Sequence, residues 1–391
     1  MHDMRWAQAD HACRTHTAAA NAYPLLMMRG NKILVVASLV ALVVVACSAG
    51  PDRVTPEPGA TRTVATTAAW RAVEAPSTCQ CSDGSSFRFW IHRGDPKKVM
   101  FFLQGGGACF SAATCGPTNP TYTRNLDDEH GPTGKSAKGI FDLTDSRNPF
   151  RGWSIVYVPY CTGDVHIGNA THDYGNGVVI HHNGFVNAST ALAATAAAFP
   201  GASQLAVVGA SAGSVASPLY AGLAHDLFPK AGIKVLADSS GAYPGTPTLT
   251  AAIGSLWGTT SAIPNWPSAK GVDVASWTLP GLFVQAAKHD PDIVFARHDY
   301  ASDSVQSTFT SLVGLSADNL VEMIDGNGRD IRAAGVRLHS WVGPGSDHTI
   351  VQKPGFYKES LDGVKLYSWV ADLLAGNELA ELHCAPDACK G

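Results

Sequence analysis

The sequence predicts an α/β fold in which helices flank a mostly parallel central sheet. Three observations support this prediction. Short apolar runs bounded by turn residues recur along the chain, and alanine-rich stretches that favour helices separate them. The 391 residues are also 45% hydrophobic and only 15% charged, so the chain can bury a large core. Continuous apolar runs are typical of strands buried on both faces.

The apolar runs predict six strands, and the alanine-rich stretches predict two helices between them. The strands are expected at residues 99–103, 155–159, 205–208, 233–237, 293–296 and 336–342, and the helices at 188–198 and 214–225. Residues 87–92 alternate between apolar and polar and predict an added antiparallel strand. Residues 246–280, rich in Gly, Pro, Ser and Trp, are interpreted as an insertion near the functional edge of the sheet. Its Trp257, Trp266 and Trp277 are expected to form local core, with a substrate platform as the alternative.

The N-terminal part of the chain predicts export and a lipid anchor. Residues 1–27 have no coherent pattern and are interpreted as an upstream extension. Residues 28–46 carry Arg29 and Lys32 before an apolar run that is shorter than the ~20 residues needed to span a bilayer, which is typical of a signal peptide. The ending Val44-Val45-Ala46-Cys47 resembles a bacterial lipobox, so Cys47 is the expected acylated residue, with an ordinary secretory signal as the alternative.

The following stretch, residues 47–69, is rich in Pro, Thr and Ala and predicts a flexible linker. Residues 70–391 are expected to form a single catalytic domain. The sequence therefore predicts a protein that is exported and anchored by lipid at the bacterial cell envelope.

Charge and cysteine content limit the partners and cofactors. The formal net charge of −4 offers no basic stripe for phosphates, so nucleic acid is not an expected partner. In an oxidising compartment, Cys109 could pair with Cys115, and Cys384 with Cys389. Cys79, Cys81 and Cys161 make an odd set, so one of them should stay free or pair with another chain. No second close cysteine pair or spaced histidine pair completes a tetrahedral metal site, and neither metal nor cofactor is expected.

The pentapeptide Gly209 to Gly213 fits the GxSxG nucleophile elbow and follows a predicted strand. This turn exposes its serine at the carboxyl end of the sheet, so Ser211 is the expected nucleophile. A plain Gly/Ser turn is the alternative. A serine hydroxyl needs a base and an acid to orient that base, and in α/β hydrolases the chain order is Ser, Asp or Glu, His. His348, just beyond the last predicted strand, is the expected base.

Two carboxylates follow the predicted strand at 293–296, namely Asp299 and Asp303. Chain order alone does not choose between them, and a surface Asp in a turn is the alternative for each. The Gly105-Gly106-Gly107 loop after an early predicted strand is the expected oxyanion loop, because glycines let backbone N–H groups approach a substrate closely. A phosphate-binding loop is excluded because no Gly-Lys-Ser/Thr follows.

Taken together, these segments resemble the pectin acetylesterase and Notum family of carboxylesterases. Residues 102–110 (FLQGGGACF) are similar to the family's glycine loop, 158–165 (VPYCTGDV) to its IPYCxxDV segment, 209–213 to its GxSAG elbow and 236–239 (LADS) to its ADS strand end. The resemblance implies an α/β-hydrolase-like fold. It assigns the nucleophile to Ser211 and the base to His348.

The resemblance also distinguishes the two carboxylates, because the family's acid stands in a DxxQ string that begins here at Asp303. It implies oxyanion donors at Gly106, Gly107 and Ala212, and disulfides Cys81–Cys161 and Cys109–Cys115. Gly107 departs from the aromatic residue that animal members carry, which leaves the acyl-pocket wall undetermined.

The sequence therefore predicts a cofactor-free serine carboxylic-ester hydrolase. The expected substrate is an extracytoplasmic ester, either a small molecule or a polysaccharide that loses an acetyl group. Two alternatives remain: a lipase or polyester depolymerase with the same machinery, and a non-catalytic surface protein that binds glycans.

Overall fold

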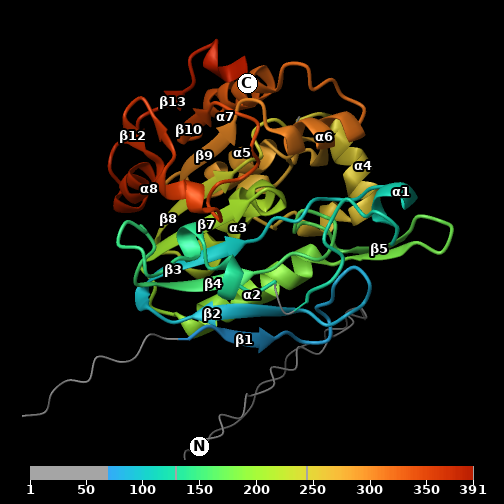
Figure 1. Cartoon of the computed structure of the whole chain (residues 1–391). Helices are drawn as coiled ribbons and strands as arrows, with labels where there is room; N and C mark the ends of the chain where they lie inside the picture. The colour runs from blue at the N-terminus through green and yellow to red at the C-terminus, as the bar shows by residue number, and fades with distance from the viewer. Residues whose placement is uncertain (1–68, 128–129, 244, 391) are drawn as a thin grey trace, which may run out of the picture. The chain divides into compact units, whose positions relative to one another are not determined.

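A nine-stranded sheet forms the centre of the computed structural model, which describes residues 69–127, 130–243 and 245–390 (Figure 1). The strand order is β1-β2-β4-β3-β7-β8-β9-β10-β13. Strands β1 and β2 are antiparallel to their neighbours, and the pairs from β4 to β13 are parallel. The strands are β1 (Arg71–Glu74), β2 (Arg88–His92), β3 (Asp95–Leu103), β4 (Trp153–Val158), β7 (Gln204–Ala210), β8 (Gly232–Asp238), β9 (Val294–Tyr300), β10 (Leu338–Gly343) and β13 (Leu382–His383).

Helices and two small hairpins surround this sheet. The helices are α1 (Ala112–Cys115), α2 (Gly184–Ala198), α3 (Ala212–Leu227), α4 (Pro247–Trp257), α5 (Gly281–His289), α6 (Ser304–Leu312), α7 (Leu320–Ala333) and α8 (Leu366–Ala375). The hairpins pair β5 (Ala170–Asp173) with β6 (Val179–His182), and β11 (Ser360–Leu361) with β12 (Val364–Lys365). No helix of the described residues is both long and apolar enough to cross a membrane.

The apolar strands bury side chains on both faces of the sheet, as their sequence predicts. Along β3, Phe101 and Leu103 belong to the core that includes α2, α3 and α5. Met100 and Phe102 face the opposite core, which includes Trp369 of α8. Because side chains alternate along a strand, a run without polar residues needs a covered sheet on both sides. The predicted α/β fold with a mostly parallel sheet is confirmed.

The predicted elements occur close to their expected positions, with one consequential difference. All six predicted strands and both predicted helices are present, and residues 88–92 form an antiparallel strand. Strand β9, expected to end at 296, continues to Tyr300. Asp299 is therefore a strand residue with no exposed surface, and a surface turn at this position is wrong. The polar side chains at the end of β9 can be buried because they pair with other polar groups inside the fold.

The predicted signal peptide, the acylated Cys47 and almost all of the linker lie outside the described residues. The three expected disulfides, Cys81–Cys161, Cys109–Cys115 and Cys384–Cys389, are present. Cys79 is a free, buried thiol, which is the odd cysteine that the count required.

Candidate active site

Ser211 stands at the sharp turn between β7 and α3. Its backbone has φ 53° and ψ −118°, a conformation that non-glycine residues rarely adopt and that is typical of the nucleophile elbow. A Cβ at Gly209 would overlap the backbone of Gly213, and a Cβ at Gly213 would overlap the carbonyl of Leu103. These overlaps explain why both flanking positions are glycine. The Ser211 N–H donates to the Asp238 carbonyl oxygen at 2.8 Å, which ties the elbow to the end of β8.

The glycine loop after β3 lies against this elbow. A Cβ at Gly105 would come within 2.8 Å of the Ser211 Cβ, so the loop approaches the serine more closely than any side chain permits. Gly107 has φ 82°, which favours glycine. Within the described residues, no backbone hydrogen bond uses the N–H of Gly106 or Gly107. Ala212 is the first residue of α3, so its N–H has no intrahelical acceptor. These three N–H groups are available to an oxyanion.

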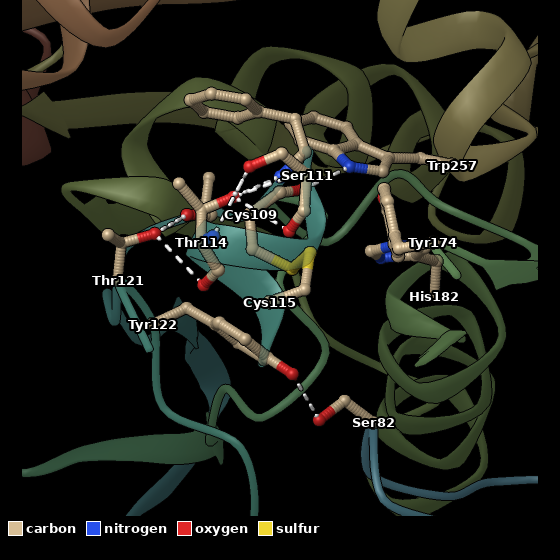
Figure 2. Close-up of a disulfide and its surroundings, with 12 residues drawn as sticks. Ser82, Cys109, Ser111, Thr114, Cys115, Thr121, Tyr122, Tyr174, His182 and Trp257 are labelled. Atoms are coloured by element: carbon tan, nitrogen blue, oxygen red, sulfur yellow. Dashed lines mark hydrogen bonds between the residues drawn. A yellow bond between two sulfur atoms is a disulfide. The ribbon is translucent and has the colours of Figure 1, made fainter. Parts of the chain in front are cut away.

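The glycine loop is held from behind by a disulfide and an indole. Cys109 follows the loop and is bonded to Cys115, and its carbonyl accepts a hydrogen bond of 2.7 Å from Trp257 Nε1 (Figure 2). In the same region, His166 Nε2 lies 2.8 Å from the Gln104 carbonyl oxygen. Burial lowers the pKa of His166 to about 4, so the imidazole is neutral and donates this hydrogen bond at neutral pH.

His348 and Asp303 form a hydrogen-bonded pair. His348 Nδ1 lies 2.7 Å from Asp303 Oδ2, and Asp303 has no exposed surface. The other oxygen of Asp303 accepts the N–H groups of Val305 and Gln306, both at 2.9 Å, and thereby caps α6. The backbone of α6 therefore holds the Asp303 carboxylate in place independently of its hydrogen bond to His348. His348 Nε2 is buried and has no hydrogen-bond partner among the described residues. It therefore makes no hydrogen bond to Ser211 in this structure.

Asp299 has different partners from Asp303. Its Oδ2 lies 2.9 Å from Nε of the buried Arg297, and its Oδ1 accepts the Gly241 N–H at 2.8 Å. Burial raises the pKa of Asp299, while the Arg297 charge opposes this shift. Gln306 Nε2 lies 3.1 Å from both Asp299 and Asp303. The geometry thus joins His348 to Asp303 and joins Asp299 to an internal ion pair.

Asp238 and Ser239 hold the segment that follows His348, a role that the sequence analysis missed. Asp238 Oδ2 accepts the N–H groups of Ile350 and Val351 at 2.7 and 2.9 Å, and its Oδ1 lies 3.0 Å from His298 Nδ1. Ser239 Oγ accepts the Thr349 N–H at 2.9 Å. The available signal was an Asp at the carboxyl end of a buried strand, which is where open α/β sheets bind ligands.

A cavity of about 780 Å³ opens beside Ser211. Its wall is apolar and comes from α4, from the end of α6 and from Phe110 and Val215. Trp257 also lines it, but Trp257, Trp266 and Trp277 are all buried, at 4%, 4% and 7% exposed. Trp266 stacks on His289, with ring centroids 4.2 Å apart. A platform of exposed tryptophans is therefore wrong, and the favoured interpretation as local core is confirmed for all three.

Two sets of side chains in the described residues have metal-like spacing. They are Cys109, Cys115 and His182, and His383, Cys384 and Cys389. All four cysteines are in disulfides, so they are not thiolate ligands.

The fold and the site define an α/β-hydrolase-like protein, and comparisons with known proteins agree. Residues 63–253 match the family model described as pectinacetylesterase. The solved structure of the Wnt deacylase Notum from Drosophila superposes with a TM-score of 0.57 at 16% identity, covering 82% of this chain and 97% of that one.

Curated relatives match over shorter stretches. The palmitoleoyl-protein carboxylesterase notum2 of Xenopus laevis is 31% identical over 94 residues, which cover 23% of this chain and 19% of that protein. The inactive palmitoleoyl-protein carboxylesterase notum1b of Danio rerio is 32% identical over 97 residues, covering 24% of this chain and 68% of that protein. The chain belongs to the pectin acetylesterase and Notum family of carboxylesterases.

The family match has a boundary inside the candidate site. Residues 63–253 contain the glycine loop and Ser211, whereas Asp303 and His348 lie beyond them. The chain spans only 19% of the length of notum2 and 18% of the length of notum1, both of Xenopus laevis. The roles of the acid and the base therefore depend on the geometry described above.

Proposed function

We propose that this protein is a serine carboxylesterase whose acyl site takes a long hydrocarbon chain. The observation that carries the proposal is the apolar cavity of about 780 Å³ that Ser211 lines together with Gly107. An acetyl group would leave most of this space unfilled. A long acyl chain would bury its methylenes there, each contributing about 0.8 kcal/mol. The names of the relatives, which describe palmitoleoyl-protein carboxylesterases, support the same substrate class.

In this mechanism, His348 removes the proton of Ser211 while the hydroxyl oxygen attacks the ester carbonyl carbon. Asp303 stabilises the imidazolium that forms. The N–H groups of Gly106, Gly107 and Ala212 stabilise the oxyanion of the tetrahedral intermediate. His348 then protonates the leaving alcohol, and a water molecule activated by the same histidine hydrolyses the acyl-enzyme.

Removal of acetyl groups from a polysaccharide is the second candidate function. The match to the pectinacetylesterase family model favours it. Hydrolysis of p-nitrophenyl esters of increasing chain length separates the two candidates. A maximum in kcat/KM at eight or more carbons supports the long acyl chain, and a maximum at acetate supports deacetylation.

Ser211→Ala tests the proposed enzyme activity. We expect turnover to fall by roughly 10⁴-fold or more, because loss of the nucleophile removes the function of the whole triad. Ser217→Ala is the matched control, since Ser217 lies on the same helix and its hydroxyl donates to the Ser214 carbonyl. Near-normal turnover of Ser211→Ala, with no labelling of the wild type by a fluorophosphonate, would show that the protein is not a serine esterase.

We also propose that the protein is exported and anchored at the bacterial cell envelope through a lipid on Cys47. The lipobox-like sequence and the three disulfides of the described residues support export to an oxidising compartment. Cys47→Ala should move the protein from the membrane fraction to the soluble fraction. Unchanged partitioning of this variant would contradict the anchor.

A further inference from the structure

A second cavity, of about 300 Å³, lies on the other side of helix α4 from the cavity at Ser211. Ile167, Leu219, Ile263, Val274, Trp277 and Leu282 make most of its wall apolar. The proposed function does not use this space. An unsatisfied sugar hydroxyl would be costly here, whereas the end of a hydrocarbon chain would not be.

The residues of α4 divide between the two cavities according to helical spacing. Leu249, Ala252 and Leu256 line the cavity at Ser211, and Thr250 and Gly254 line the second cavity. Side chains three or four positions apart share one face of a helix. The two cavities are therefore on two faces of one helix, which forms the wall between them.

Among the described residues, Ile253 alone lines both cavities. Its side chain is 5% exposed and stands at the boundary between the two faces of α4. Isoleucine is branched at Cβ and has one strongly preferred χ1 rotamer in a helix. The Ile253 side chain is therefore a fixed partition between the two cavities.

Helix α4 is capped by its own Thr246 at the N-terminal end and tied to other segments at the C-terminal end, so we attribute the partition to the side chain rather than to movement of the helix. At the N-terminal end, Thr246 Oγ1 accepts the Leu249 N–H at 3.3 Å. At the C-terminal end, Trp257 donates from Nε1 to the Cys109 carbonyl at 2.7 Å and accepts the Asn169 N–H at its own carbonyl at 2.8 Å.

We propose that Ile253 sets the upper limit of acyl chain length, and that the second cavity receives the end of a longer chain once this side chain is shortened. The inference rests on the proposed function, because the acyl chain must enter from Ser211. An acyl chain that ends before Ile253 fills the first cavity. A longer one meets the isoleucine and is rejected.

The test is a chain-length profile of p-nitrophenyl esters from two to eighteen carbons. Ile253→Ala should raise kcat/KM for the esters just beyond the wild-type limit by tenfold or more, since each methylene that becomes buried adds about fourfold. Short esters, whose chains end before Ile253, should gain less than these longer esters. Ile253→Val, a milder change, should move the limit in the same direction by less.

A second substitution identifies where the longer chain goes. A Cβ at Gly254 meets only Thr259 Oγ1, at 3.7 Å, so a leucine there has room and points toward the second cavity. Adding Gly254→Leu to Ile253→Ala should restore the wild-type limit. Leu249→Ala is the matched control, because Leu249 lines only the first cavity, and Gly254→Leu should not reverse its profile.

Two results would overturn the inference: an unchanged limit in the folded Ile253→Ala and Ile253→Val variants, or a longer limit that Gly254→Leu does not reverse. Failure of the proposed function looks different and is visible in the wild type itself, which would then hydrolyse no ester or would hydrolyse acetate best. In that event, a binding experiment tests the same partition without catalysis. Fatty acids of increasing length displace a fluorescent fatty acid from the Ser211→Ala variant, and the experiment is repeated with Ile253→Ala added.

Discussion

The edge of the sheet that carries the proposed triad and the wall of the proposed acyl cavity lie next to each other but are held by different forces. At the edge, Asp238 and Asp303 are fully buried, and each accepts several hydrogen bonds from fixed donors. The cavity wall of α4 and α6 is built mostly from aliphatic and aromatic side chains, and of these Trp257 is also held by its hydrogen bond to the Cys109 carbonyl. Hydrogen bonds fix geometry, whereas apolar packing mainly fixes volume. Substitutions at the edge should therefore change rate, and substitutions in the wall should change selectivity.

The largest effect within this comparison should come from Asp303→Asn. We expect kcat to fall by roughly 10³- to 10⁴-fold with the fold intact, because an amide does not stabilise the imidazolium and favours the wrong tautomer of His348. The helix cap at α6 should survive, since Asn is also a good N-cap residue. Steady-state kinetics, with circular dichroism to check folding, measures this.

Asp299→Asn is the matched control for Asp303→Asn. It leaves the buried Arg297 without its carboxylate, so the free energy of unfolding should fall by about 3–5 kcal/mol while kcat changes far less. The opposite ranking of the two variants in kcat would transfer the role of the acid to Asp299.

A smaller effect on rate is expected at Asp238. Asp238→Ala removes the acceptor of the Ile350 and Val351 N–H groups and should loosen the segment after His348. We expect kcat to fall by up to roughly 10²-fold with little change in KM, since a small displacement of a catalytic group costs about this much. Asp238→Asn should lose less, because its amide oxygen can still accept from the loop. Equal, wild-type kcat for both variants would show that the loop does not depend on Asp238.

The smallest effect concerns how the stability of the protein changes with pH, which depends on three buried titratable residues, namely His166, His182 and Asp164. Burial lowers the pKa of His166 and of His182 to about 4. Between pH 6.5 and 4 the unfolded chain therefore binds more protons at these residues than the folded protein, so stability falls as the pH falls through this window. Burial raises the pKa of Asp164 to about 6, which offsets part of this loss because the folded protein holds that proton longer.

We expect a net loss of roughly 1–3 kcal/mol on going from pH 7.5 to pH 4.5, because two histidines oppose one carboxyl group. Chemical denaturation at the two pH values measures it. His182→Gln should reduce the pH dependence, since glutamine does not titrate. Equal stability of the wild type at the two pH values would contradict the expectation.

Much of the fold and part of the site could be predicted from the sequence because they depend on local patterns. The apolar runs of β3, β4 and β7 are continuous, and the GxSxG spacing is a recognised local pattern. The steric reason for Gly209 lies within the turn, whereas that for Gly213 is the contact with Leu103 of β3. His348 could be predicted as the base from chain order together with its position just beyond the last predicted strand. The choice of Asp303 needed the resemblance to a known family. Strand β9 continues past its apolar residues through buried polar residues up to Asp299, so a fall in hydrophobicity does not mark where the strand ends.

The remaining features depend on contacts between distant segments. The tie from Asp238 to Ile350 joins residues 112 positions apart, and the Trp257 bond to Cys109 joins residues 148 apart. No local pattern encodes such pairs. The same holds for the two cavities, since their walls combine α4 with residues from the elbow, α3, α5 and α6.

The anchoring of α4 between two strands of the sheet has an evolutionary consequence. The chain leaves the sheet at Asp238 and returns at the start of β9, and Asp238 is already fixed by its bonds to the elbow and to the segment after His348. Insertions, deletions and substitutions between Thr246 and the start of β9 can alter the proposed acyl cavity while the contact of Ser239 with the segment after His348 is kept. A lineage can therefore acquire new substrates by changing one continuous stretch of gene while the catalytic apparatus is inherited unchanged.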